Sequence, residues 1–164
     1  MNKIVIILKV RIITIFTLRG EIHMDQSFHY LSMAVHATVQ KKLMEELKET
    51  GLTLGQPKVL DYLKDHDGSS QKEIARACHI EPGSLTSILN RMEEKRLIER
   101  RSLNGNRRTS YIFLTEQGTQ SQQLIDGIFA QIEAQAFRGI PETEQEKWMK
   151  QFRQIYENLC QADA

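Results

Sequence analysis

The sequence contains few of the residues that cross-link or interrupt a chain. Its 164 residues include two cysteines, three prolines and one tryptophan. Cys78 and Cys160 lie far apart and form no Cys-x-x-Cys pair, so the sequence offers neither a disulfide framework nor a cysteine-rich zinc site. A reducing, cytoplasmic setting is the simplest interpretation.

Signatures of catalysis are also missing. The chain has no glycine-rich phosphate loop, no nucleophile elbow and no pair of acidic residues that the pattern places on one cleft. His29 and His36 share a face of a predicted helix, but no further metal ligands accompany them. We therefore expect the chain to be no enzyme and to hold no metal and no cofactor.

No uncharged apolar run reaches the roughly 20 residues that a membrane span needs, so we expect no membrane partner. Residues 4–18 are apolar, but Lys9 and Arg11 interrupt them and no small-residue cleavage site follows, which excludes a secretory signal. An Arg-Gly-Glu sequence just before Met24 corresponds to purine-rich codons that resemble a ribosome-binding site. One hypothesis is that translation starts at Met24 and that residues 1–23 are leader. The alternative is a real strand or membrane-surface extension.

The net charge of +1 gives no overall attraction to nucleic acid, but the cations are unevenly distributed. Between Ser84 and Tyr111 seven cations accompany three anions, which leaves a local charge of +4. A local basic patch is the electrostatic footprint of a nucleic-acid site; a solvated charged face is the alternative. The cations are Arg91, Lys95, Arg96, Arg100, Arg101, Arg107 and Arg108.

Apolar spacing predicts helices on both sides of this patch. Residues 25–49 show helical periodicity that Gly51 ends. Pro57 suits the first turn of a second helix, with a buried stripe of Val59, Leu60 and Leu63. After residue 115, which caps another helix, Gly118 is a weak point inside that helix. The last helix carries the apolar residues Trp148, Phe152, Ile155 and Leu159 on one face.

The segment between these helices has the pattern of a winged helix-turn-helix. Ser70 and Glu73 form a capping box before a short helix. Pro82 begins a second helix that runs to about Lys95, and Asn104-Gly105 between two alternating strands is a strong hairpin signal. Such a module places its second helix in a DNA groove with the hairpin beside it.

The fold class predicted from these elements is mainly α with a small β-hairpin wing. Amphipathic terminal helices must bury their apolar faces. We expect a homodimer rather than packing on the same domain, because two-fold pairing of a helix-turn-helix matches a palindromic site. The predicted segments are an extension at 1–23, a dimerisation helix at 24–53, the winged helix-turn-helix at 54–115 and C-terminal dimerisation helices at 116–164.

The segment from Leu54 to Gly118 resembles the MarR (multiple antibiotic resistance regulator) family of bacterial transcription factors. The resemblance rests on an ordered set of motifs: Ser70-Gln71-Lys72-Glu73-Ile74-Ala75, residues 84–93, Leu97-Ile98-Glu99-Arg100, Asn106-Arg107-Arg108 and Leu114-Thr115-Glu116-Gln117-Gly118. It implies a dimeric winged helix-turn-helix regulator of transcription, acting as a ligand-responsive repressor on a pseudo-palindromic operator. A winged helix that binds only other proteins is the alternative.

Three residues depart from the pattern usual in the family. Arg96 stands where glycine is usual after the recognition helix, and a left-handed backbone there would cost on the order of 1 kcal/mol. Asn90 and Asn106 replace acidic residues. Their neutral side chains put a family-type salt bridge between helix and wing in doubt, and would leave Arg107 and Arg108 freer to meet phosphates.

Residues that would contact DNA lie on both helices and on the hairpin. Small hydroxyl side chains permit close approach to the major groove, where Thr86 offers a methyl group to thymine and Asn90 suits adenine. For the serines and the threonine, an ordinary helix surface is an equal alternative. The predicted DNA-binding set is Gln71, Lys72, Ser84, Thr86, Ser87, Asn90, Arg91, Arg107 and Arg108.

The resemblance also implies a small phenolic or lipophilic effector. On the first helix the candidate effector-binding residues are Tyr30, Met33 and His36, although an aromatic and Met-rich stripe is more often core than pocket. Cys78 is expected to be a small core residue and Cys160 to be exposed near the end of the last helix.

Overall fold

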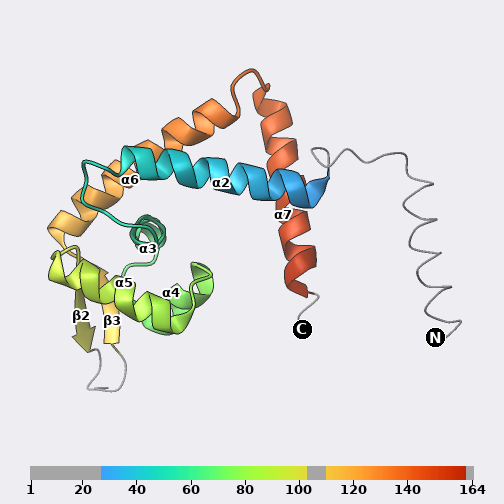
Figure 1. Cartoon of the computed structure of the whole chain (residues 1–164). Helices are drawn as coiled ribbons and strands as arrows, with labels where there is room; N and C mark the ends of the chain where they lie inside the picture. The colour runs from blue at the N-terminus through green and yellow to red at the C-terminus, as the bar shows by residue number, and fades with distance from the viewer. Residues whose placement is uncertain (1–26, 103–109, 162–164) are drawn as a thin grey trace, which may run out of the picture. The chain divides into compact units, whose positions relative to one another are not determined.

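The computed structural model of the chain describes residues 27–102 and 110–161, which form two compact units that meet between Lys42 and Leu43. The fold is mainly helical with a small antiparallel sheet, as predicted (Figure 1). Within the described residues, no helix is both long and apolar enough to cross a membrane. The elements are α2 (Phe28–Glu46), α3 (Gln56–Asp65), β1 (Ser69–Ser70), α4 (Gln71–Ala77), α5 (Pro82–Glu94), β2 (Ile98–Ser102), β3 (Ser110–Leu114), α6 (Glu116–Ala136) and α7 (Glu142–Gln161).

The first unit contains most of α2, whose apolar side chains lie largely on the surface. Met33 is 70% exposed and Val35 is 60% exposed. The end of the helix belongs to the second unit, where Leu43 is buried, as is Leu47 just after the helix. The periodicity of residues 25–49 therefore predicted the helix, while burial is confined to its C-terminal end.

The core of the second unit is built from α3, α4 and α5 with the sheet and α6. The apolar stripe predicted for α3 is buried, which confirms the periodicity from which it was inferred, and α4 and α5 bury their apolar faces in the same core. Full burial of each such side chain contributes about 1.5–3 kcal/mol relative to exposure. The helix-turn-helix thus has its own core, formed among others by Val59, Leu60, Leu63, Ile74, Leu85, Leu89 and Met92.

The sheet has three strands in the order β1-β3-β2, all antiparallel. β2 and β3 are the predicted hairpin strands, and their register places Ile98 opposite Leu114 and Arg100 opposite Ile112. The Asn-Gly turn between them lies outside the described residues. β1 was not predicted, because a two-residue polar strand leaves no alternating pattern in the sequence.

Both helices of the helix-turn-helix are followed, just after the C-cap, by a non-glycine residue in the left-handed conformation. His79 has φ 50° after α4 and Arg96 has φ 57° after α5. The next N–H group in each case bonds back across the helix end, from Ile80 to Ala75 and from Leu97 to Met92, which completes a Schellman motif. The left-handed turn expected at Arg96 is therefore present, at a cost of roughly 1 kcal/mol for each such residue.

Gly118, which the sequence suggested was a weak point of its helix, is a point of close packing in the first turn of α6. The Thr115 hydroxyl caps this turn by accepting from the Gly118 N–H at 3.0 Å and donating to the Arg96 carbonyl. A Cβ atom at position 118 would overlap the backbone carbonyl of Leu97. Glycine is required here because the turn that follows α5 passes against the start of α6.

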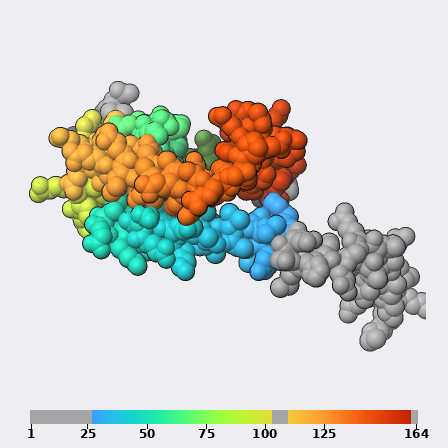
Figure 2. All heavy atoms as spheres, turned by 90° about the horizontal axis from the view of Figure 1, so that it is seen from above, coloured from blue at the N-terminus to red at the C-terminus, as the bar shows by residue number. Residues whose placement is uncertain are grey.

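The two C-terminal helices differ in burial. α6 buries Ile125, Ile128 and Ile132, and its Asp126 pairs with Lys64 of α3 at 2.7 Å. The chain then turns at Gly139, and α7 follows with no buried residue. In Figure 2, α7 forms a lobe beside the end of α6. Its predicted apolar face carries Trp148, Phe152 and Leu159, which are 44–60% exposed.

Candidate nucleic-acid interface

The exposed side of α5 brings together all the residues that the sequence placed on the recognition helix. Its other side is anchored in the core by Leu85, Leu89 and Met92. The helix is therefore held as a rigid element, and its polar side chains are presented from a fixed backbone. The exposed predicted residues are Ser84, Thr86, Ser87, Asn90 and Arg91.

Gln71 and Lys72 are the first two residues of α4, as predicted. Ser70 and Glu73 form the full capping box, with the Ser70 N–H donating to the Glu73 carboxylate at 2.8 Å. Hydrogen bonds from Ser70 lower the pKa of Glu73, so this carboxylate stays ionised and neutralises part of the positive helix end. Attraction for phosphate at this point therefore depends mainly on the side chains of Gln71 and Lys72.

The first residue of α4 also contacts the recognition helix directly. The Gln71 amide donates to the Thr86 hydroxyl at 2.6 Å. This joins two of the predicted DNA-binding residues, fifteen positions apart, into one polar unit on the surface.

A bridge between α5 and β2 is present despite the neutral side chain of Asn90. The doubt about a family-type salt bridge stays open for Asn106, which lies outside the described residues. Arg100 of β2 donates to Asn90 Oδ1 at 2.8 Å and forms an ion pair with Glu93. Glu93, one helical turn after Asn90, supplies the negative charge that aspartate would provide. Asn90 retains its amide N–H groups for DNA, while part of its acceptor capacity is already used.

The other cations of the basic patch fall into two groups. Lys95 donates to the Gly51 carbonyl, and Arg101 pairs with Glu99 and lies 4.5 Å over the Phe113 ring. These cations support the module itself. Among the described residues, Arg91 donates from its Nε to the Ser87 carbonyl at 3.2 Å, which leaves its terminal N–H groups available for a DNA contact. Arg107, Arg108 and Asn106 lie outside the described residues.

A cleft of about 700 Å³ lies at the start of α4, beside the turn into α5. It adds Arg76 to the cations near the site, a residue that the sequence analysis did not single out. Its position one helical turn after Lys72 was the available signal, since residues four apart share a helix face. The cleft is lined by Gln71, Lys72, Ala75, Arg76, Ile80 and Pro82.

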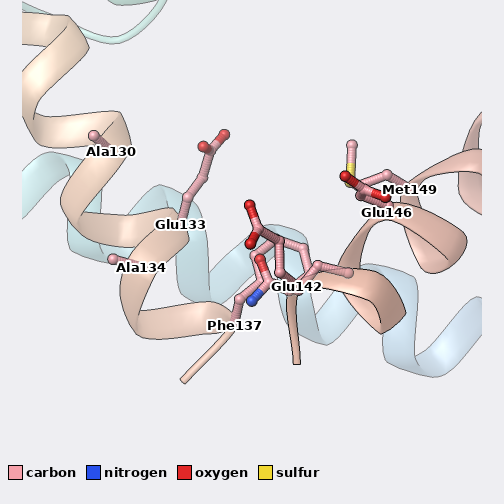
Figure 3. Close-up of a pocket in the computed structure, with 8 residues that line it drawn as sticks. Ala130, Glu133, Ala134, Phe137, Glu142, Glu146 and Met149 are labelled. Carbon is pink, nitrogen blue, oxygen red and sulfur yellow. The ribbon is translucent and has the colours of Figure 1, made fainter. Parts of the chain in front are cut away.

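A second cleft, between α6 and α7, has the opposite charge. Its volume is about 580 Å³, and the carboxylates of Glu133, Glu142 and Glu146 lie around it (Figure 3). Three carboxylates repel a phosphate backbone, so this surface is unsuited to DNA. The α4–α5 surface therefore remains the candidate nucleic-acid interface.

A contact from the last helix reaches the turn of the helix-turn-helix. The Tyr156 hydroxyl lies 3.0 Å from His79 Nε2, and the two rings meet edge to face. Nothing in the sequence pattern indicated this pair, because the residues are 77 positions apart. It links α7 to the left-handed residue that follows the C-cap of α4.

The cysteines occupy the environments expected of them. Cys78 is buried, and its thiol donates to the Lys58 carbonyl at 3.5 Å. Burial raises its pKa, which disfavours the reactive thiolate. Cys160 is exposed.

The predicted effector residues all lie on α2 in the first unit. Tyr30, Met33 and His36 are exposed there. The acidic cleft between α6 and α7 contains none of them.

Comparison with known proteins agrees with this architecture. A sequence profile of the MarR family matches residues 50–109. The HTH-type transcriptional repressor MdtR of Bacillus subtilis (strain 168) is 31% identical over 97 residues, which cover 57% of this chain and 63% of MdtR. The chain thus spans about three fifths of the length of that relative.

Solved structures match over a longer stretch. A MarR-family regulator from Silicibacter pomeroyi superimposes with a TM-score of 0.76 at 19% identity, covering 85% of this chain and 94% of that chain. S. aureus MepR in its DNA-binding conformation gives a TM-score of 0.74 at 25% identity, with 81% and 98% covered. MepR has also been crystallised as a complex with DNA. Residues 50–109 therefore match the MarR family profile, and the helix-turn-helix with its wing strands shares the fold of these solved regulators.

Proposed function

We propose that the chain is a sequence-specific, double-stranded DNA-binding transcription regulator. The observation that carries the proposal is α5, whose exposed side presents Ser84, Thr86, Ser87, Asn90 and Arg91 while its other side is locked in the core. Short polar side chains on a rigid helix suit the major groove. MdtR, described as a transcriptional repressor, and the DNA complex of MepR support the same interpretation.

We further propose that it acts as a homodimeric repressor on a pseudo-palindromic operator. The support is the apolar face of α7, where Trp148, Phe152 and Leu159 are exposed on a helix with no buried residue. A second copy would cover this face, and two-fold symmetry would present two recognition helices to two half-sites.

A small phenolic or lipophilic molecule is the proposed effector, with Tyr30, Met33 and His36 of α2 as its candidate contacts. Their exposed apolar and aromatic side chains are the only support for this part of the proposal. Isothermal titration with salicylate tests it: Met33→Ala should weaken binding, whereas equal affinity would remove α2 from the effector site.

A binding titration with the DNA upstream of the protein's own gene tests the proposed function. We expect this fragment to be bound at least about 1,000-fold more tightly than an unrelated fragment of equal length. Equal, weak binding of both fragments would instead favour a winged helix that binds only proteins.

Salt dependence then tests the contribution of the wing. Arg108→Ala should weaken binding to all DNA sequences and reduce the slope of log affinity against log salt by about one phosphate contact. An unchanged slope would remove Arg108 from the DNA-contacting set. Lys150→Ala, on the exposed surface of α7, is the matched control for removing one cation.

A further inference from the structure

The Thr86 hydroxyl is fully engaged within the protein. Its Oγ1 donates to the Pro82 carbonyl at 3.0 Å, one turn earlier in α5. The same oxygen accepts from the Gln71 amide at 2.6 Å. A threonine hydroxyl carries a single hydrogen, so Thr86 has no donor left for a base edge or a phosphate.

These two hydrogen bonds also fix the direction of the side chain. They come from different helices, α4 and α5, and a β-branched side chain has few χ1 rotamers to choose from. With Oγ1 held between Pro82 and Gln71, the group that Thr86 offers from its exposed position is its methyl. Gly83 in the preceding turn has open space where a Cβ would lie, so little bulk stands beside that methyl.

We propose that Thr86 selects thymine at one position of each half-site through contact between its methyl group and the thymine 5-methyl group. Gln71 is the positioning residue that holds Thr86 for this contact. The inference rests on the proposed function, in which α5 enters the major groove. Among the bases, thymine alone presents a methyl group there, and threonine's methyl is a suitable partner for it.

Gln71 has a second role open to it in the same arrangement. Only one amide hydrogen is used on Thr86, so the other hydrogen and the Oε1 atom remain. At the start of α4, this group can bond the DNA backbone while it orients Thr86. Gln71 would then align the backbone contact with the base contact.

Replacement of single thymines by uracil tests the proposal, because uracil lacks only the 5-methyl group. The probe is the upstream duplex, with one thymine changed at a time and affinity measured by fluorescence anisotropy. For the wild type we expect one thymine in each half-site at which uracil weakens binding about fourfold, the effect of burying one methyl group. Thr86→Ser, which keeps the hydroxyl but lacks the methyl, should bind both duplexes equally.

Thr119→Ser is the matched control. Thr119 lies on α6, outside the helix-turn-helix, and its hydroxyl also donates to a carbonyl four residues earlier, at 3.1 Å. This variant should retain the wild-type ratio between the thymine and uracil duplexes. Gln71→Ala should lower that ratio although Thr86 is intact, and Gln71→Ser, too short to reach Thr86, should not restore it. A purely structural role for Gln71 would change total affinity and leave the ratio unaltered.

The outcomes separate this inference from the proposed function. If the wild type does not prefer the upstream duplex over unrelated DNA, the proposed function fails. If it does, but no thymine shows methyl dependence or Thr86→Ser keeps that dependence, the thymine contact is refuted while the proposed function stands. If Thr86→Ser abolishes the dependence but Gln71→Ala preserves it, the positioning role of Gln71 is refuted.

Discussion

The helix-turn-helix and α7 have equally clear apolar periodicity, yet one is packed and the other is not. In α5, Leu85 and Leu89 are fully buried. In α7, Trp148 and Phe152 are likewise four positions apart but remain 46% and 44% exposed. The difference teaches that helical periodicity identifies the apolar face of a helix, but not what covers that face.

The helix-turn-helix module is also held by a close contact between backbones, at the junction between α5 and α6. Gly118 lets the start of α6 approach the Leu97 carbonyl, and the Thr115 hydroxyl bonds across the same junction to Arg96. A substitution at this junction should therefore damage the module itself. A substitution on α7 should change assembly and leave the module folded.

The largest effect is expected from Gly118→Ala. The added Cβ would overlap the Leu97 carbonyl, and because backbone cannot move as easily as a side-chain tip, the free energy of unfolding should fall by about 3 kcal/mol or more. Urea denaturation measures this.

Gly127→Ala is the control for that substitution. It lies in the same helix, where a Cβ would have no neighbouring atom within 4 Å, and should raise stability by up to about 1 kcal/mol through helix propensity. Similar changes in the free energy of unfolding for Gly118→Ala and Gly127→Ala would show that the close backbone approach at Gly118 does not contribute to stability.

The second largest effect is expected from Leu159→Glu. In the proposed dimer interface on the apolar face of α7, the new glutamate carboxylate would be unpaired and would lose its hydration. The free energy of dimerisation should therefore weaken by about 2 kcal/mol, or roughly 30-fold in affinity. Because Leu159 is 60% exposed in one chain, the folded monomer should be retained. Sedimentation equilibrium and circular dichroism measure the two quantities.

Lys150→Glu introduces the same carboxylate on the opposite side of α7, about 200° around the helix from Phe152 at about 100° per residue. It should leave the dimer affinity nearly unchanged. Equal dimerisation of Leu159→Glu and the wild type would refute the placement of the dimer seam on this face of α7.

Much of the fold was predictable because its helices bury apolar residues that recur at helical spacing in the sequence. Val59, Leu60 and Leu63 were inferred from spacing, and all three are completely buried. β1 escaped prediction because its two serines pair with a strand some forty residues later in the chain. The role of Gly118 escaped for a related reason, since its neighbour Leu97 lies far away in the sequence, in the turn between α5 and β2.

In the candidate site, too, features of a single helix could be predicted from the sequence, whereas contacts between elements could not. The exposed side of α5 follows from counting around one helix, so Ser87 and Arg91 were identified from sequence. Contacts between elements were not: the Gln71–Thr86 bond and the Arg100–Asn90 bond depend on how two elements are placed. The departure at Asn90 was visible in the sequence, whereas compensation by Glu93 was not.

A smaller effect is expected from Arg100→Met, which removes the bridge between α5 and β2. Stability should fall by about 1 kcal/mol, because Arg100 is only partly buried and its ion pair is partly solvated. DNA binding should weaken several-fold, while the slope of log affinity against log salt should stay the same. A reduced slope would instead identify Arg100 as a phosphate contact.

The smallest effect is expected from Arg96→Gly, and it is a gain. Glycine adopts φ 57° without the steric cost that arginine bears, so thermal unfolding should show a stabilisation of about 1 kcal/mol or less. His79→Gly relieves the same backbone conformation but removes the ring contact and hydrogen bond with Tyr156. Its gain should therefore be smaller than that of Arg96→Gly. If the two gains are equal, the Tyr156 contact contributes nothing to stability, and α7 is energetically as separate from the helix-turn-helix as its exposed face suggests.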